Sequence, residues 1–280
     1  MTKIALKRWA NFERALKSID TERKKRSRAS GARMRNPLFR GVGCSLWGLE
    51  TTLERAYPTE CIDNASSLRK YYHRISTAKS AVETFGDRQW KDLPTVPEFD
   101  ELITDNPVGW LDMILFKYPS IYEYIVYLRH HGFPSPLLDW TASPYVAAFF
   151  AFDSPPAHAK DVAIYAIVQG SGAAGSSDAH LFFVGPYMHA HPRHIQQQCQ
   201  YSICVAMDGK NKDFLFRPQD TGMRYALGNG GELFKIIIPV TERVAALRHL
   251  ELMNINAFSL FGSPDGLVHT VARRELLFRD

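Results

Sequence analysis

The segment from 137 to 144, with the sequence LLDWTASP, places an acid, an indole and two hydroxyls close together along the chain. Asp139, Thr141 and Ser143 can hydrogen-bond a sugar or a phosphate, and Trp140 can stack on a planar ring. Because helix N-termini present unpaired N–H groups to anions, one interpretation is a pocket for a phosphate or a ribose hydroxyl. The other is structural: Asp139 and Ser143 cap a helix while Trp140 fills the core.

Local signals predict the elements that position these side chains. Two prolines hold the approach extended, which predicts a short strand at 137–138. Ser143-Pro144 predicts the start of a helix, because serine caps free N–H groups and proline fits the first helical position. The apolar run 146–152 indicates that this helix is buried. We therefore expect residues 139–141 to form the turn between strand and helix.

The composition predicts an ordinary globular protein. With 280 residues, of which 45% are hydrophobic, the chain can bury a large core. It contains no apolar run of the roughly 20 residues that a membrane helix needs and no apolar leader after its first charges, so we expect a cytoplasmic protein without a membrane partner. The four cysteines form no C-x-x-C pair, which argues against a disulfide framework or a zinc ribbon.

Positive charge is concentrated at the N-terminus. Residues 1–40 hold 13 Lys and Arg against 3 Asp and Glu, a net +10, whereas the remaining residues hold 21 against 26, a net −5. Residues 4–26 have helical spacing of apolar side chains, so we predict a basic helical arm over 1–36 and one main domain over 37–280. The arm could follow a phosphate backbone or bind an acidic partner, and a solvated face is the alternative.

The order of the remaining elements predicts an α+β fold with a mixed or antiparallel sheet and an N-terminal helical region. Strand signals occur at 37–43, 161–168, 180–184, 200–206 and 232–239. Helix signals occur at 51–88, 98–104, 110–116, 121–131, 241–253 and 267–275.

Three blocks of the sequence resemble the FRG domain family. The first two comprise Phe39-Arg40-Gly41, Trp47-x-Leu49, Thr52-Leu53-x-Arg55 and His130-x-Gly132-x-Pro134 leading into 137–144. The third is the glutamine-rich block 193–201. The resemblance runs from about 39 to 239. FRG domains in turn resemble the ADP-ribosyltransferase fold, in which an arginine, a Ser/Thr-centred strand and a late acid or amide surround NAD.

The resemblance implies a role for each candidate catalytic residue. Arg40 would bind the pyrophosphate of NAD, and Thr141 and Ser143 would orient the nicotinamide ribose. Gln197 takes the third place by motif match, but its block contains no acid. Glu232, which begins a strand, is the substitute by position. The structural alternatives are a buried ion-pair arginine for Arg40, a polar loop residue for Gln197 and a surface charge for Glu232.

The NAD-binding residues that the resemblance implies are Arg40, Gly41, His130, Asp139, Trp140, Thr141 and Ser143. Such a site needs to hold the diphosphate still and to stabilise the positive charge that forms on the ribose when nicotinamide leaves. We expect no metal, because the spacing of His189, His191, His194, Cys199 and Cys204 matches no closed zinc site.

These expectations lead to one principal function and three alternatives. The principal function is transfer of ADP-ribose from NAD to a nucleic acid, with RNA favoured, by a bacterial toxin of a defence or toxin–antitoxin system that has an antitoxin partner. The basic N-terminus supports a nucleic-acid acceptor. The alternatives are a protein-directed ADP-ribosyltransferase, an NAD glycohydrolase and a non-catalytic module that binds a nucleotide or a protein.

Overall fold

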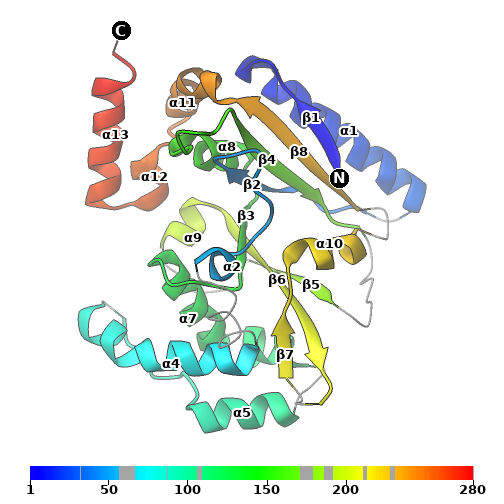
Figure 1. Ribbon diagram of the computed structural model, residues 1–280, viewed down its shortest axis with the longest axis vertical. Coiled ribbons are helices and arrows are strands. Elements are labelled where there is room, and N and C mark those ends of the chain that lie inside the picture. The colour runs from blue at the N-terminus through cyan, green and yellow to red at the C-terminus, as the bar shows by residue number, and fades with distance from the viewer. Residues whose placement is uncertain are drawn as a thin grey trace.

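A mixed sheet organises the computed structural model of the protein (Figure 1). The structure describes residues 1–31, 33–56, 67–86, 88–105, 109–170, 179–185, 192–210, 213–227 and 231–279. The strands are β1 (Thr2–Ala5), β2 (Leu38–Val42), β3 (Leu138–Thr141), β4 (Asp161–Val168), β5 (His180–Val184), β6 (Cys199–Asp208), β7 (Asp213–Phe216) and β8 (Glu232–Pro239). Their order is β1-β8-β4-β2-β3-β6-β5, and β7 pairs with β6.

Most strand pairs in this sheet are antiparallel. The β1–β8 pair is parallel, and the pairs that join β8, β4, β2, β3, β6 and β5 are antiparallel. The expected mixed sheet accompanied by helices is therefore confirmed. Every strand predicted from the sequence is present, but β1 and β7 were not predicted, because four residues carry too short a signal.

The helices are α1 (Phe12–Ser30), α2 (Thr52–Ala56), α4 (Leu68–Phe85), α5 (Val96–Asp105), α6 (Trp110–Asp112), α7 (Pro119–His130), α8 (Pro144–Asp153), α9 (Pro192–Gln196), α10 (Gln219–Ala226), α11 (Arg243–Leu252), α12 (Ala257–Phe261) and α13 (Pro264–Leu276). A π-helical turn, Met113–Lys117, follows α6. The predicted helices are confirmed where the structure describes them, whereas α9, α10 and α12 were not predicted. Residues 57–66 of the predicted 51–88 helix lie outside the described part.

Alternating side chains divide the core into layers. On β4, Val162, Ile164 and Ala166 pack with apolar residues of α1, α8 and α11, whereas Tyr165 and Ile167 face the opposite side of the sheet, where α10 packs. A separate cluster joins β5, β6 and β7 to α4, α5 and α7. Successive strand residues point to opposite faces, so the continuous apolar sequence of β4 is that of a strand covered on both sides.

The N-terminal segment is part of the main body, which corrects the prediction of an arm. Strand β1 pairs with β8, from Thr2 opposite Phe234 to Ala5 opposite Ile237. Figure 1 shows β1 and α1 beside β8. The apolar stripe of the predicted helix enters the core, where Trp9, Phe12 and Ile19 are buried. The helix also starts later than predicted, because residues 2–5 extend the sheet.

Strand β3 continues further than the sequence indicated. Asp139, Trp140 and Thr141 lie within β3 and pair with β6, so their predicted position in the turn is wrong. The turn is confined to Ala142 and Ser143, and the Ser143 Oγ accepts a hydrogen bond from the Val146 N–H at 3.3 Å. The predicted helix cap is confirmed. Pairing with neighbouring strands on both sides decided the length of β3, and a local signal carries no information about that pairing.

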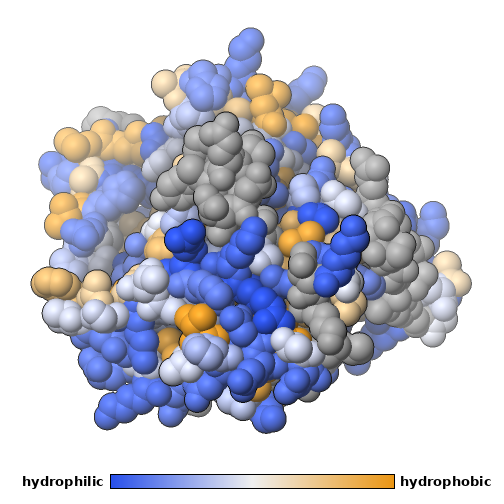
Figure 2. All heavy atoms as spheres, turned by 60° about the horizontal axis from the view of Figure 1, so that its bottom comes forward, coloured by the Kyte–Doolittle hydropathy of each residue, from blue (hydrophilic) through white to orange (hydrophobic). Residues whose placement is uncertain are grey.

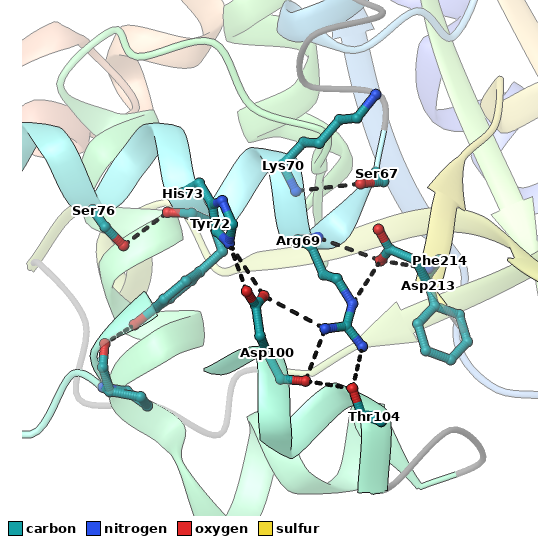
Figure 3. A network of polar contacts seen from close by, with 11 residues as sticks. Ser67, Arg69, Lys70, Tyr72, His73, Ser76, Asp100, Thr104, Asp213 and Phe214 are labelled. Carbon is teal, nitrogen blue, oxygen red and sulfur yellow. Dashed lines mark hydrogen bonds and ion pairs between the residues drawn. The ribbon is translucent and has the colours of Figure 1, made fainter. Parts of the chain in front are cut away.

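A polar network joins the helical layer to the sheet (Figure 3). The Arg69 guanidinium donates to the Asp100 carbonyl and to Thr104 Oγ1, both at 2.8 Å. His73 Nε2 lies 3.1 Å from the Asp100 carboxylate, and Arg69 Nε lies 4.0 Å from the carboxylate of Asp213 on β7.

The coloured part of the surface that Figure 2 shows, turned toward the α4–α5 end, is mainly hydrophilic.

Candidate functional site

A cavity of about 420 Å³ lies where β2 and β3 meet. The two strands pair at one position, Phe39 opposite Thr141, and residues of both strands line the cavity. Helix α7 contributes Arg129 and His130, α2 contributes Thr52 and Arg55, and α8, α9 and α12 complete the wall. The volume falls within the range of about 300–1,000 Å³ that is typical of small-molecule sites.

Arg40 projects from β2 at this cavity. Its Nη1 donates to the backbone carbonyl of Asp139 at 3.0 Å, whereas its buried Nε has no hydrogen-bond partner among the described residues. Burial lowers the pKa of Arg40 to about 10, an effect that Arg129 and Arg55 reinforce and Asp139 opposes. The guanidinium is therefore cationic at neutral pH and has a buried N–H donor to which no described residue offers an acceptor. Such an orphaned donor is costly unless a ligand or a water satisfies it.

Asp139 forms a two-bond ion pair with Arg129. Both carboxylate oxygens accept from the Arg129 guanidinium, whose Nη1 also donates to Thr52 Oγ1 at 2.7 Å. Burial raises the pKa of Asp139, but the charge and hydrogen bonds of Arg129 outweigh burial and hold that pKa below its ordinary value. The carboxylate is thus ionised and oriented, and the pair ties β3 to α7 and α2.

Positive charge dominates the cavity wall. In the part of the chain that the structure describes, four arginines line it, Arg40, Arg55, Arg129 and Arg193, together with one carboxylate, that of Asp139. The lining therefore carries a net charge of +3. Arginine presents a fork of donors that matches phosphate oxygens, so this wall is suited to an anionic ligand such as a diphosphate.

The two hydroxyls of the candidate site serve the fold. Thr141 Oγ1 donates to the Gln197 carbonyl at 2.7 Å and accepts from the Ser143 N–H at 3.1 Å. Thr141 lines the cavity and keeps acceptor capacity, but its proton is already used. Ser143 caps α8 and is not among the lining residues. The structure therefore brings Thr141 to the cavity with Arg40, and it does not bring Ser143 there.

Gln197 lines the cavity, but its amide is committed to another element. Its Nε2 donates to the Leu260 carbonyl at 3.0 Å, and Arg193 Nε donates to the Phe261 carbonyl at 3.2 Å. Both carbonyls belong to the last turn of α12, which has no intrahelical donors for them. Arg193 and Gln197 thus attach α12 to the cavity wall, a role that the sequence did not reveal because α12 lies far along the chain.

Glu232 lies at a different place in the structure from Arg40. Its carboxylate accepts from Arg26 Nη2 at 2.9 Å and from Thr2 Oγ1 at 2.9 Å, and it is not among the residues that line the cavity. Of the two residues that the sequence offered to complete the site, Gln197 lines the cavity with Arg40 and Glu232 does not. Parallel pairing of β1 with β8 brings the N-terminal segment to this carboxylate, which joins α1 and β1 to the sheet.

Gly41 and Trp140 border the cavity for structural reasons. A Cβ on Gly41 would stand 1.8 Å from the Ala147 carbonyl, so only glycine allows α8 to pack this closely on β2. Trp140 is 1% exposed, and its Nε1 donates to Ser202 Oγ at 2.8 Å. Its ring therefore offers no open face to a ligand, and the structural interpretation of Trp140 is the correct one.

His130 and Cys199 line the cavity beside a buried tyrosine. His130 Nε2 lies 2.9 Å from the Tyr201 hydroxyl, which also lies 3.3 Å from His194 Nδ1. Burial raises the pKa of the Cys199 thiol to about 12, so this thiol is protonated and is a poor nucleophile. Among the described residues no three His, Cys, Asp or Glu side chains group as a metal site, and His189 and His191 lie outside them.

Sequence reasoning missed several residues that line the cavity. These are Trp47, Thr52, Arg55, Arg129, Phe150, Arg193 and Phe261. The motif that follows Arg40 contains Trp47, Thr52 and Arg55. Their closeness to Arg40 along the chain was the signal that could have predicted their place at the cavity. Arg129 precedes the predicted His130, but its contact with Asp139 depends on how α7 packs beside β3.

One family model matches part of the chain. Residues 35–160 match the family model of the FRG domain, a range that includes Arg40, Arg129 and Asp139 and excludes the glutamine-rich block. The match supports the FRG family for this part of the chain. No curated protein and no solved structure matches the chain. In the described residues we find no helix with the length and apolar character needed to span a membrane.

Proposed function

We propose that the protein is an NAD-dependent ADP-ribosyltransferase whose acceptor is RNA. The observation that carries the proposal is Arg40: its buried Nε lacks an acceptor among the described residues, and it stands at a cavity whose lining has a net charge of +3. The diphosphate of NAD supplies anionic oxygens for this wall. The resemblance of FRG domains to the ADP-ribosyltransferase fold selects NAD among diphosphate ligands.

In this proposal, some residues of the cavity bind the diphosphate of NAD and others orient the groups near the ribose. Arg40 binds the diphosphate, and Arg129 keeps Asp139 ionised and in place. NAD supplies the ADP-ribosyl group, with nicotinamide as the leaving group. Asp139 provides negative charge near the ribose, and Thr141 Oγ1 offers an acceptor lone pair for a ribose hydroxyl. A site of this kind accelerates the reaction by positioning and by fixed charge.

The acceptor and the cellular role rest on the basic N-terminal helix. Lys24, Lys25 and Arg28 lie on one part of α1 and border a surface hollow. This charge supports a polyanionic acceptor, and equally an acidic antitoxin, for a toxin of a bacterial defence or toxin–antitoxin system. A protein acceptor and water, which would give an NAD glycohydrolase, are the alternatives that the experiment below separates.

One observation favours a second candidate, a non-catalytic nucleotide-binding module. The carboxylate of Asp139 is held by the Arg129 fork, and the amide of Gln197 is held by Leu260. Neither group is then released to assist a reaction, although the arginines still suit an anionic ligand. This candidate predicts that the protein binds NAD or ADP-ribose and does not turn NAD over.

The test combines calorimetry with isotopically labelled NAD. Wild-type protein is expected to bind NAD, and Arg40→Lys to bind it about 10- to 150-fold more weakly, because losing charge-assisted hydrogen bonds costs about 1.5–3 kcal/mol. Arg74→Lys, a change on the remote helix α4, is the matched control.

Incubation with labelled NAD, RNA and protein then separates the candidates. Label on RNA supports the proposal, and label on protein or release of free ADP-ribose supports an alternative enzyme. Binding without turnover supports the non-catalytic module. Equal NAD affinity of Arg40→Lys and the wild type would overturn the assignment of this site.

A further inference from the structure

An exposed indole stands at the edge of the cavity. Trp47 lies in the loop between β2 and α2, lines the cavity and is 38% exposed, and the neighbouring Leu46 is 87% exposed. The rings of Trp9, Trp90 and Trp140, by contrast, are buried in the core clusters. An apolar ring that the fold leaves in solvent beside a ligand cavity is a candidate contact for that ligand or for a second substrate.

The fold fixes the backbone under this ring. The Tyr165 hydroxyl donates to the Trp47 carbonyl at 2.7 Å, and Lys235 Nζ lies 3.4 Å from the same oxygen. The Ser45 N–H donates to the Asp161 carbonyl at 2.8 Å, which anchors the start of the loop to β4. The loop is therefore tied to the sheet at two points, so the backbone that carries the exposed ring is held in place before a ligand arrives.

The side chains that contact the Trp47 carbonyl, Tyr165 and Lys235, lie in line with Arg40 across the sheet. Tyr165 lies opposite Arg40 in the β2–β4 pair, and Lys235 lies opposite Tyr165 in the β4–β8 pair. Residues opposite one another share a face of the sheet, so the three side chains form a row across it. Lys235 is 7% exposed, and its ammonium lies 4.7 Å from the centre of the Tyr165 ring. This row fixes the backbone carbonyl of Trp47 relative to Arg40.

The chemistry of the cavity edge fits a nucleobase followed by a phosphate. Arg55 is exposed and lines the same cavity as Trp47. An aromatic ring with a neighbouring arginine is the combination by which proteins bind single-stranded nucleic acid, because every base has a face that stacks and every linkage carries a charge. The partly buried Arg40 suits the cofactor diphosphate, whereas the exposed Trp47 ring at the cavity edge suits the second substrate.

We propose that Trp47 is the stacking platform for an unpaired base of the acceptor RNA, with Arg55 on the adjoining phosphate and Tyr165 as the residue that positions the indole. The proposal rests on the proposed function, because it names the acceptor contact of the same site. It assigns the loop between β2 and α2 to acceptor recognition and the buried arginine to the cofactor.

Tryptophan fluorescence tests the proposal directly. Titration with a short single-stranded RNA of mixed sequence is expected to quench the wild-type protein, and Trp47→Phe is expected to lose that quenching while it keeps RNA affinity. Trp47→Ala is expected to bind RNA about 5- to 150-fold more weakly, because stacking on a base contributes about 1–3 kcal/mol. Circular dichroism checks that the variants stay folded.

Two further variants separate positioning from other effects. Tyr165→Phe removes the hydroxyl that donates to Trp47 and is expected to weaken RNA binding about 2- to 12-fold, in line with about 0.5–1.5 kcal/mol for one hydrogen bond. Lys79→Met removes a positive charge on the remote helix α4 and is expected to leave RNA affinity unchanged.

The outcomes distinguish this proposal from the proposed function. Equal RNA affinity of Trp47→Ala and the wild type would overturn it, as would an equal loss of NAD and RNA affinity, which would assign the ring to the cofactor. A failure of the proposed function instead appears as absent NAD binding in the wild type. RNA quenching that depends on Trp47 would still show that the platform binds bases.

Discussion

At the scale of single residues, the arginines that line the cavity differ in how far the protein already satisfies their hydrogen-bond donors. All three nitrogens of Arg129 donate to Asp139 or Thr52, whereas Arg40 retains a buried Nε without a partner in the described residues. An arginine whose three nitrogens all bind protein groups stabilises the fold, and one with an unpartnered buried nitrogen has that donor left for a ligand. This difference makes Arg40 the residue on which the proposed function depends.

Replacing Asp139 with asparagine tests the ion pair. We expect Asp139→Asn to lower the free energy of unfolding by about 2 kcal/mol at pH 7, less than for a fully buried pair because the carboxylate is partly exposed. The folded-state pKa of Asp139 is depressed, so the stabilisation is present above the unfolded pKa of about 3.9 and is lost as the pH falls through the lower folded value.

Urea unfolding of both proteins between pH 7 and pH 3 measures this dependence. The difference in unfolding free energy is expected to shrink below about pH 4, the reference value of an unperturbed aspartate. Asp112→Asn, at an exposed carboxylate, serves as the control. A difference that stays constant down to pH 3 would contradict the assignment of a depressed pKa.

At the scale of elements, close packing of α8 on β2 shapes the cavity. Gly41 lets the helix backbone approach the strand, and Arg40 precedes it on the opposite face. The adjacent arginine and glycine therefore do different work: one serves the ligand cavity and the other serves helix packing. Helix α12 is attached on the far side of the cavity by the side chains of Arg193 and Gln197.

Substitution of Gly41 by alanine should show how tight this contact is. The new Cβ would stand 1.8 Å from the Ala147 carbonyl, so α8 must move away from β2. We expect Gly41→Ala to lower the free energy of unfolding by at least about 3 kcal/mol, the upper end for an overpacked core. Chemical denaturation measures the change.

Gly209→Ala is the matched control for this substitution, because a Cβ at that position would meet no described atom within 4 Å and the φ of Gly209 is not positive. It should change the unfolding free energy by no more than about 0.5 kcal/mol, as is usual for surface substitutions. Similar effects of the two changes would mean that the α8–β2 contact is looser than described.

At the scale of the whole molecule, the first 31 residues complete the sheet and the core. Strand β1 covers the edge of β8, and Trp9, Phe12 and Ile19 fill the layer beneath α8. Deletion of residues 1–31 should therefore expose a strand edge and an apolar surface, and the truncated protein is expected to aggregate or unfold. Gel filtration and circular dichroism measure both effects.

The matched comparison for the deletion is the triple change of Lys24, Lys25 and Arg28 to alanine, which removes surface charge and leaves the buried stripe intact. This variant should stay folded and lose RNA affinity with a weaker dependence on salt. A deletion variant that remains a folded monomer with the wild-type melting temperature would restore the view of the segment as a separate arm.

The sequence alone determined much of the fold, because the signals for its strands, helices and helix caps are local. The apolar runs of β4 and β8, the Ser143 cap and the order of the predicted elements required only neighbouring residues. The FRG motifs likewise led to Arg40 and to the segment that contains Asp139, and both line the cavity. Periodicity and capping are properties of short segments, so a single sequence is enough to detect them.

Only the tertiary structure decided which of these residues share a site and which are already engaged. The Arg129–Asp139 pair depends on the packing of α7, the commitment of Gln197 depends on the distant α12, and the position of Glu232 depends on the pairing of β1 with β8. Each contact joins two segments that are separate along the chain, and neither segment has a local sequence pattern that predicts the contact. The physical reason is that hydrogen-bond donors and acceptors pair by proximity in space, which depends on how the sheet and its helices pack together.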